Sequence, residues 1–152
     1  MADEVVVIGV GNPDRGDDAA GRRVAAALRG SVPDGVVVIE SDGDPATIMD
    51  AWQGADLAVL VDAMVSESRP GVVRRFDATD DPLPIAVNLS STHGMGAAEA
   101  IELARSLGRL PSRLLVYGIE GVVFHPGAEM SGPVSDAVDV AIGMVLGEVA
   151  GA

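Results

Sequence analysis

Acidic side chains dominate the residues of this chain that could do chemistry. Most of them follow apolar runs of the sequence: Asp17, Asp18, Asp42, Asp44, Asp62 and Glu120. The only imidazoles are His93 and His125. Carboxylates joined by one imidazole form an oxygen and nitrogen ligand set that leaves coordination positions open to water or to a substrate group. These residue types therefore favour a site for a borderline divalent ion such as nickel, zinc, iron or manganese.

Each carboxylate also has an ordinary structural interpretation. Asp17 and Asp18 precede a helix-like pattern, and as a pair they favour helix capping. Asp42 and Asp44 lie in a sequence typical of a turn. Asp62 is harder to explain in this way, because a carboxylate at the end of a buried strand needs a donor, a cation or a metal ion.

The two histidines differ in their surroundings. His93 lies in the small polar stretch at residues 90–94, beside a predicted helix start, whereas His125 lies in a loop with proline and glycine. Position in the sequence favours His93 as a metal ligand and predicts a structural role in a loop for His125. The residue types alone do not decide which of the two histidines binds the metal. The hydroxyls at residues 90–92 could act as nucleophiles, yet the Gly-x-Ser-x-Gly sequence of a nucleophile elbow is missing.

Strand and helix patterns alternate along the chain and would position these side chains. Continuous apolar runs predict buried strands at residues 5–10, 35–39, 57–61 and 113–119. A run interrupted by charge predicts an edge strand at 71–76. Apolar residues at helical spacing predict helices opening at Asp17 and Asp18, at 45–52, just after His93, and from 134 onward. Residues 77–92 and 120–132 are predicted to be irregular and are long enough to be functional.

This order predicts a three-layer α/β/α fold, with a mainly parallel sheet and helices on both faces, in one domain over residues 1–152. Ligands bind outside the carboxyl ends of the strands in such sheets. The carboxylates listed above follow strands at that edge, so we expect Asp18 and Asp62 to lie close together.

Composition excludes several classes of function. The formal net charge of −13 disfavours nucleic acid and anionic membranes as partners. The chain has no cysteine, which excludes disulfides, thiolate metal sites and a cysteine nucleophile. An acidic start without a long apolar stretch predicts no signal peptide and a cytoplasmic location. A monomer is the default expectation for the free chain.

Three motifs resemble those of the hydrogenase maturation endopeptidases, and the similarity extends over essentially the whole chain. The first runs from Gly9 to Gly21 as GVGNPDRGDDAAG, the second is VDA around Asp62, and the third is STHG around His93. The resemblance implies a five-stranded twisted sheet with one antiparallel or edge strand. It also selects His93 over His125 and implies that Asp18, Asp62 and His93 bind the metal and carry the catalysis.

The resemblance further implies an aspartic-type, metal-dependent endopeptidase. Its substrate would be the precursor of a nickel-iron hydrogenase large subunit, from which it removes a C-terminal extension after nickel insertion. The nickel would be delivered by the substrate, and other divalent ions could substitute for it. The alternative is a non-enzymatic nickel-sensing binding protein or chaperone for the same precursor. Asp44 and Pro45 depart from the family pattern in the loop after the second strand, which bears on substrate choice.

Overall fold

A computed structural model of the chain describes residues 4–92 and 95–151. Its main sheet follows the order β2-β1-β3-β8-β4. These strands are β1 (Val5–Val10), β2 (Val36–Ser41), β3 (Leu57–Val65), β8 (Arg113–Glu120) and β4 (Val73–Asp77). The first four run parallel, and β4 lies antiparallel to β8 at the edge. The predicted mainly parallel sheet with one antiparallel edge strand is confirmed.

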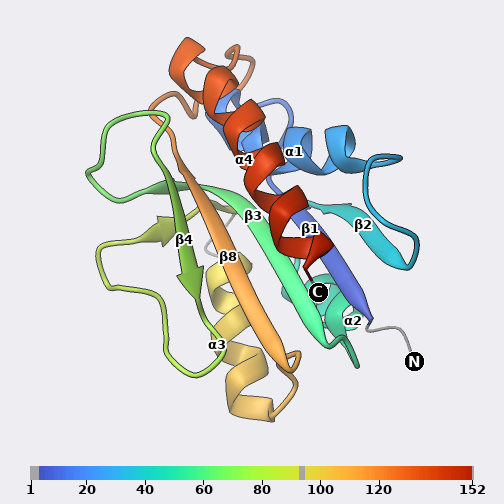
Figure 1. Cartoon of the computed structure of the whole chain (residues 1–152). Coiled ribbons are helices and arrows are strands. Elements are labelled where there is room, and N and C mark those ends of the chain that lie inside the picture. Colours follow the sequence, from blue (N-terminus) through green and yellow to red (C-terminus); the bar gives the residue numbers. More distant parts are fainter. Residues whose placement is uncertain (1–3, 93–94, 152) are drawn as a thin grey trace.

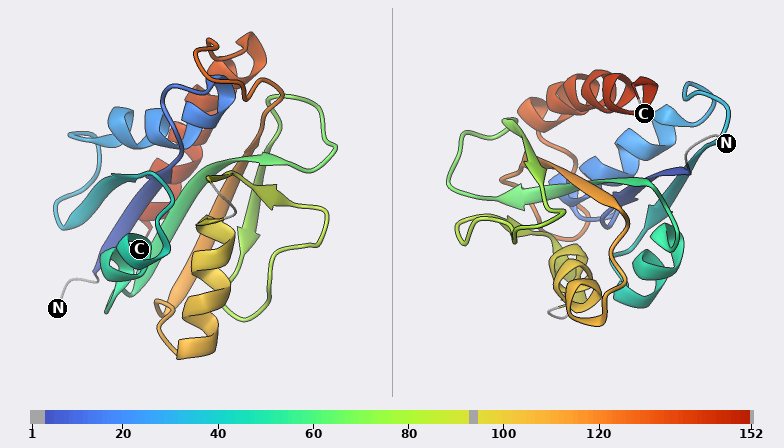
Figure 2. Two further views of the ribbon diagram at one scale, coloured as in Figure 1. Left: turned by 180° about the vertical axis from the view of Figure 1, so that it is seen from behind. Right: turned by 60° about the horizontal axis from the view of Figure 1, so that its bottom comes forward.

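Helices cover both faces of this sheet, as predicted (Figure 1). One face carries α1 (Ala20–Leu28) and α4 (Gly132–Ala150), and the other carries α2 (Pro45–Trp52) and α3 (Ala97–Leu107). The right-hand view in Figure 2, in which the bottom of the molecule is turned forward, shows the sheet between the two layers of helices. Because successive strand residues point to opposite faces, Val59 and Val61 pack toward α1 and α4, while Leu60 packs toward α2 and α3.

Close packing of α1 on the sheet depends on a glycine. A Cβ atom at Gly21 would come within 2.2 Å of the Val61 carbonyl oxygen and 2.4 Å of the Val10 carbonyl oxygen. Only a residue without a side chain allows the helix to lie so near the ends of β1 and β3. The first motif therefore fixes the distance between helix and sheet at the edge where ligands are expected.

Several boundaries differ from the sequence prediction. β3 continues through Asp62 to Val65, so Asp62 lies inside the strand rather than after it. The helix expected to open at Asp17 and Asp18 is a 3-10 turn, η1 (Gly16–Ala19), followed by α1. Part of the segment predicted to be irregular contains β5 (Asn88–Leu89), which pairs antiparallel with β3.

The structure also adds a hairpin before the third long helix. β6 (Ser91–Thr92) pairs with β7 (Met95–Gly96), and α3 begins only at Ala97, later than predicted. Two-residue strands have no periodicity that a sequence could reveal, because their pairing partners define them. Among the helices that the structure describes, none has the length and apolar character needed to cross a membrane.

Candidate functional site

The candidate site lies where the connections from β1 and β3 diverge. The strand order β2-β1-β3 places α1 and α2 on opposite faces of the sheet. In open α/β sheets ligands bind outside the carboxyl ends of the strands where the strand order reverses, which here are β1 and β3. β1 pairs with β3 only as far as Val61, and β5 takes the place beside β3 from Met64 onward. Asp62 lies in β3 between these two pairings, and Asp18 lies in the turn that follows β1.

Asp62 is fully buried and only half satisfied. The Ser90 hydroxyl donates a hydrogen bond to its Oδ1, and its Oδ2 has no hydrogen-bond partner among the described residues. Burial holds the pKa of the Asp62 carboxyl well above its ordinary value. The hydrogen bond from Ser90 opposes this rise in pKa, and the nearby charge of Asp18 adds to it.

Asp18 has the same half-satisfied character at 4% exposure. The Asn12 backbone N–H donates to its Oδ2 at 3.2 Å, while Oδ1 is buried without a partner in the described part of the chain. A buried oxygen without a hydrogen-bond donor destabilises the folded state unless a ligand binds to it. Two such oxygens, on side chains close enough for one charge to shift the pKa of the other, suit a bound cation.

The carboxylate of the neighbouring residue, Asp17, has hydrogen-bond partners for both of its oxygens. It is also fully buried, but its two oxygens accept hydrogen bonds from the backbone N–H groups of Val122, Val123 and Ser131 at 2.8 to 2.9 Å. The Ser131 hydroxyl adds a fourth at 3.1 Å. Neither η1 nor α1 has a side-chain cap, so the helix-capping interpretation of Asp17 and Asp18 is wrong. Asp17 instead ties the turn after β1 to the loop that precedes α4.

The other predicted polar residues lie in separate environments. Glu120 accepts hydrogen bonds from the Ser66 N–H and hydroxyl groups. Asp44 accepts hydrogen bonds from the Thr47 N–H and hydroxyl as the N-cap of α2, so besides the predicted turn it has a capping role that the sequence does not predict. His125 is exposed in a loop, as predicted. The acidic edge is therefore mostly structural, and among the described residues only Asp18 and Asp62 have buried side-chain oxygens without a hydrogen-bond partner.

His93, the third predicted ligand, lies outside the described residues. Within residues 4–92 and 95–151, no three histidine, cysteine, aspartate or glutamate side chains gather closely enough to hold a metal ion. The described chain thus supplies two carboxylates of the predicted ligand set.

A cavity of about 190 Å³ opens beside these carboxylates. We call it the Phe124 pocket, and its lining consists of Arg15, Asp18, Ala63, Met64, Val65, Asn88, Leu89, Ser90 and Phe124. Asp18 and the hydrogen-bond donor of Asp62 both belong to this lining, so the pocket is continuous with the candidate site. The site can therefore receive a ligand from outside.

Sequence reasoning missed three residues of this arrangement. The sequence indicates Ser90 only as a candidate nucleophile, because its hydrogen bond to Asp62 depends on β5, a two-residue strand without a recognisable sequence pattern. Arg15 could have been noticed as the one basic residue between Asn12 and Asp18 in the first motif. Phe124 could have been noticed because the chain has only four aromatic residues.

Comparison with known proteins decides the family. A sequence model described as hydrogenase maturation protease matches residues 23–148. The chain belongs to the hydrogenase maturation protease family. This match includes Asp62 and His93 and begins after Asp18.

Individual proteins connected with hydrogenase maturation or formation by name resemble the chain over most of its length. The hydrogenase expression/formation protein HupD of Thiocapsa roseopersicina is 27% identical over 94% of this chain, which spans 66% of that relative. The hydrogenase 2 maturation protease of Escherichia coli is also 27% identical, over 93% of this chain and 88% of its own length. The solved structure of the E. coli hydrogenase maturating endopeptidase HybD superposes with a TM-score of 0.80 at 25% identity, covering 95% of this chain and 91% of that one.

Proposed function

We propose that this chain is an endopeptidase that removes the C-terminal extension of a nickel-iron hydrogenase large-subunit precursor after nickel insertion. In this proposal Asp18, Asp62 and His93 bind the nickel that the precursor carries. The family supports proteolysis in hydrogenase maturation. The single observation that carries the metal-binding part is the pair of buried oxygens on Asp18 and Asp62 that have no partner within residues 4–92 and 95–151.

The residues around the two carboxylates are suited to hold them in place. The Ser90 hydroxyl fixes one oxygen of Asp62, and the Asn12 N–H fixes one oxygen of Asp18. Each side chain then presents its remaining oxygen for a ligand. Without a thiolate in the set, binding should be moderate and exchangeable, as expected if the ion arrives with the substrate. A divalent ion held there can polarise a carbonyl group or lower the pKa of a water molecule.

Incubation with a nickel-loaded precursor from the same organism tests the proposal. Wild-type protein should yield a shortened large subunit and a released peptide, both detected by mass spectrometry. Asp62→Ala, Asp18→Ala and His93→Ala should each lose processing by at least about a thousandfold while remaining folded, because each lacks one ligand. Glu148→Gln is the matched control, since it removes an acidic charge outside the site and should leave processing unchanged.

Two results would contradict this function. Normal cleavage by His93→Ala would exclude the proposed ligand set. A wild-type chain that binds the nickel-loaded precursor and leaves it at full length would instead support the binding protein or chaperone.

A further inference from the structure

We propose that the Phe124 pocket is a specificity subsite that receives one uncharged, apolar side chain of the precursor beside the scissile bond. The proposal rests on the proposed function, because it adds a side-chain requirement to the substrate of that same site. It concerns residues that the three motif-derived ligands do not include: Arg15, Met64, Leu89 and Phe124 form part of the wall.

The Phe124 pocket lies where it can contact a substrate residue next to the scissile bond. Asp18 belongs to its lining, and so does Ser90, which holds Asp62. A precursor whose scissile bond reaches the two carboxylates must lay adjoining residues over the mouth of this cavity. Val65 is 46% exposed in the lining, so part of the apolar wall is covered only when a ligand enters.

The chemistry of the wall favours an apolar occupant. Five of the nine lining residues are apolar: Ala63, Met64, Val65, Leu89 and Phe124. The Phe124 ring is held from behind, because a Cβ atom on Gly121 would approach its Cζ atom to 2.6 Å. An aromatic side chain supported in this way offers a fixed surface to a substrate group.

The volume of the pocket limits how much of the substrate it can accept. Apolar cavities of roughly 150 Å³ can hold a molecule of the size of benzene. At about 190 Å³, the Phe124 pocket accommodates one side chain of the size of leucine, methionine or phenylalanine. A longer segment of the extension would have to lie outside it.

Arg15 determines which charge the pocket excludes. Its Nε donates a hydrogen bond to the Phe124 carbonyl oxygen at 3.0 Å, which fixes the guanidinium beside the pocket. No carboxylate lies within ion-pair distance of Arg15 among the residues that the structure describes. Apart from Asp18, which the proposed function assigns to nickel, Arg15 is the only charged residue that the described part of the chain contributes to the lining of the pocket. A lysine or arginine of the substrate is therefore disfavoured here, although the protein is acidic as a whole.

Precursor variants test the subsite directly. In the nickel-loaded precursor, each residue flanking the scissile bond is changed in turn to leucine, alanine or lysine, and kcat/KM is measured for wild type, Phe124→Ala, Arg15→Gln and Val37→Ala. At one flanking position, wild type should prefer leucine to lysine by at least about 30-fold. Truncating a contact of this size should lower kcat/KM for the leucine precursor by roughly 10- to 200-fold in Phe124→Ala.

The enzyme variants distinguish a specificity role from a loss of fold. Arg15→Gln should raise the relative rate with lysine, a gain that damage to the structure would not produce. Val37→Ala truncates an apolar side chain that is 57% exposed near the amino end of β2, and it should keep the wild-type preferences. If Phe124→Ala does not fold, Phe124→Leu replaces it and should shift the preference toward larger side chains.

Cleavage by wild type without a side-chain preference at either flanking position would overturn the subsite while leaving the proposed function intact. The subsite would also be overturned, with the proposed function intact, if Phe124→Ala keeps the side-chain preference of wild type in kcat/KM. The same criterion applies to Phe124→Leu if that variant replaces Phe124→Ala. Failure of wild type to shorten any precursor would instead overturn the proposed function, and the subsite with it.

Discussion

Asp17 and Asp18 are adjacent in the sequence and almost equally buried, but their side chains have opposite hydrogen-bonding states. Asp17 accepts three backbone N–H groups and one hydroxyl, whereas Asp18 keeps one oxygen without a partner in the described structure. A satisfied buried carboxylate stabilises the fold, and an unsatisfied one costs free energy unless it binds a ligand. The difference separates a structural acid from a candidate functional acid within two residues.

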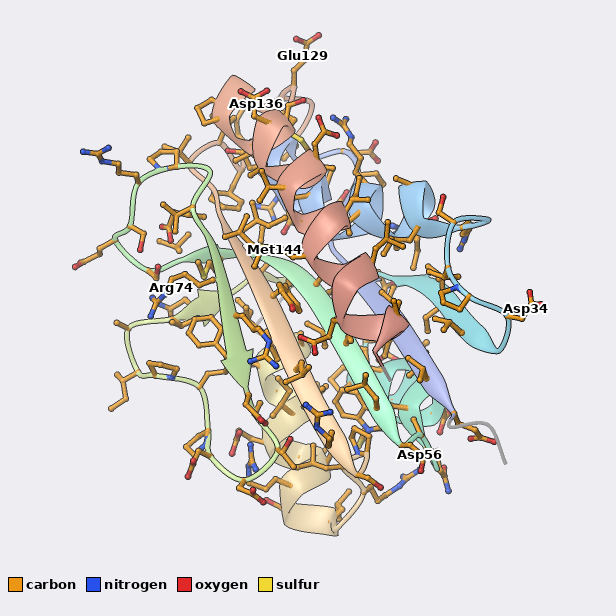
Figure 3. The ribbon with its side chains drawn as sticks, viewed as in Figure 1. Asp34, Asp56, Arg74, Glu129, Asp136 and Met144 are labelled. Atoms are coloured by element: carbon orange, nitrogen blue, oxygen red, sulfur yellow. The ribbon has the colours of Figure 1, made fainter. Side chains whose placement is uncertain are left out.

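The same contrast occurs between neighbouring strands. Glu120 on β8 accepts hydrogen bonds from Ser66, while Oδ2 of Asp62 on β3 has no partner in the part of the chain that the structure describes. Exposed acidic residues do not enter the comparison, because water solvates them: Figure 3 shows Asp34, Glu129 and Asp136 pointing away from the fold. Burial together with the number of hydrogen-bond partners, rather than acidic character, therefore distinguishes the two candidate site carboxylates from the structural ones.

The largest expected effect on stability belongs to Asp17. Asp17→Ala leaves three N–H groups without an acceptor and detaches the turn after β1 from the loop before α4. We expect a loss of about 3–5 kcal/mol in the free energy of unfolding. Urea denaturation at neutral pH measures this change, with Asp34→Ala as the exposed control. A loss of less than about 1 kcal/mol in the free energy of unfolding would contradict the role of Asp17 in joining the turn after β1 to the loop before α4.

An intermediate and pH-dependent effect is expected at Glu148, which accepts from the Arg75 guanidinium at 2.8 Å and from the Tyr117 hydroxyl at 2.7 Å. The hydrogen bond from Arg75 is the main cause that holds the pKa of Glu148 below its ordinary value; burial opposes it, and Tyr117 lowers the pKa further. The stabilisation is therefore present above the ordinary glutamate pKa and lost as pH falls through the lowered value.

The matching variant is Glu148→Gln. It should cost on the order of 1–2 kcal/mol at pH 7 and lose less stability than wild type on acidification. Melting temperatures recorded from pH 7 down to pH 3 measure both quantities. Parallel curves for the two proteins would show that Glu148 does not carry this acid dependence.

The smallest effect, and the one of opposite sign, is expected at Asp62. Burial raises the pKa of Asp62, so at neutral pH its ionised form disfavours the folded state. Asp62→Asn removes that charge and should leave stability unchanged or raise it by up to about 1 kcal/mol while processing is lost. Denaturation and processing are measured on one preparation. A destabilisation comparable to that of Asp17→Ala would remove the distinction between the two kinds of acid.

Much of the fold could be predicted from the sequence, because long apolar strands and amphipathic helices carry their own periodicity. Proximity of Asp18 and Asp62 could be predicted too, since the carboxyl ends of β1 and β3 share an edge. The different hydrogen-bonding states of the Asp17 and Asp18 carboxylates could not be predicted from the sequence. The difference depends on the N–H groups of Val122 and Ser131, which are more than a hundred residues away.

Calorimetric titration with nickel, and with cadmium as a second probe, tests the central claim most directly. Wild type and Glu148→Gln should bind one ion with the same affinity, because both keep the Asp18 and Asp62 oxygens that have no partner among the described residues. Asp18→Ala and Asp62→Ala should each weaken binding by at least about a hundredfold. Equal binding by wild type and Asp62→Ala, or no binding by wild type at millimolar metal, would contradict the account.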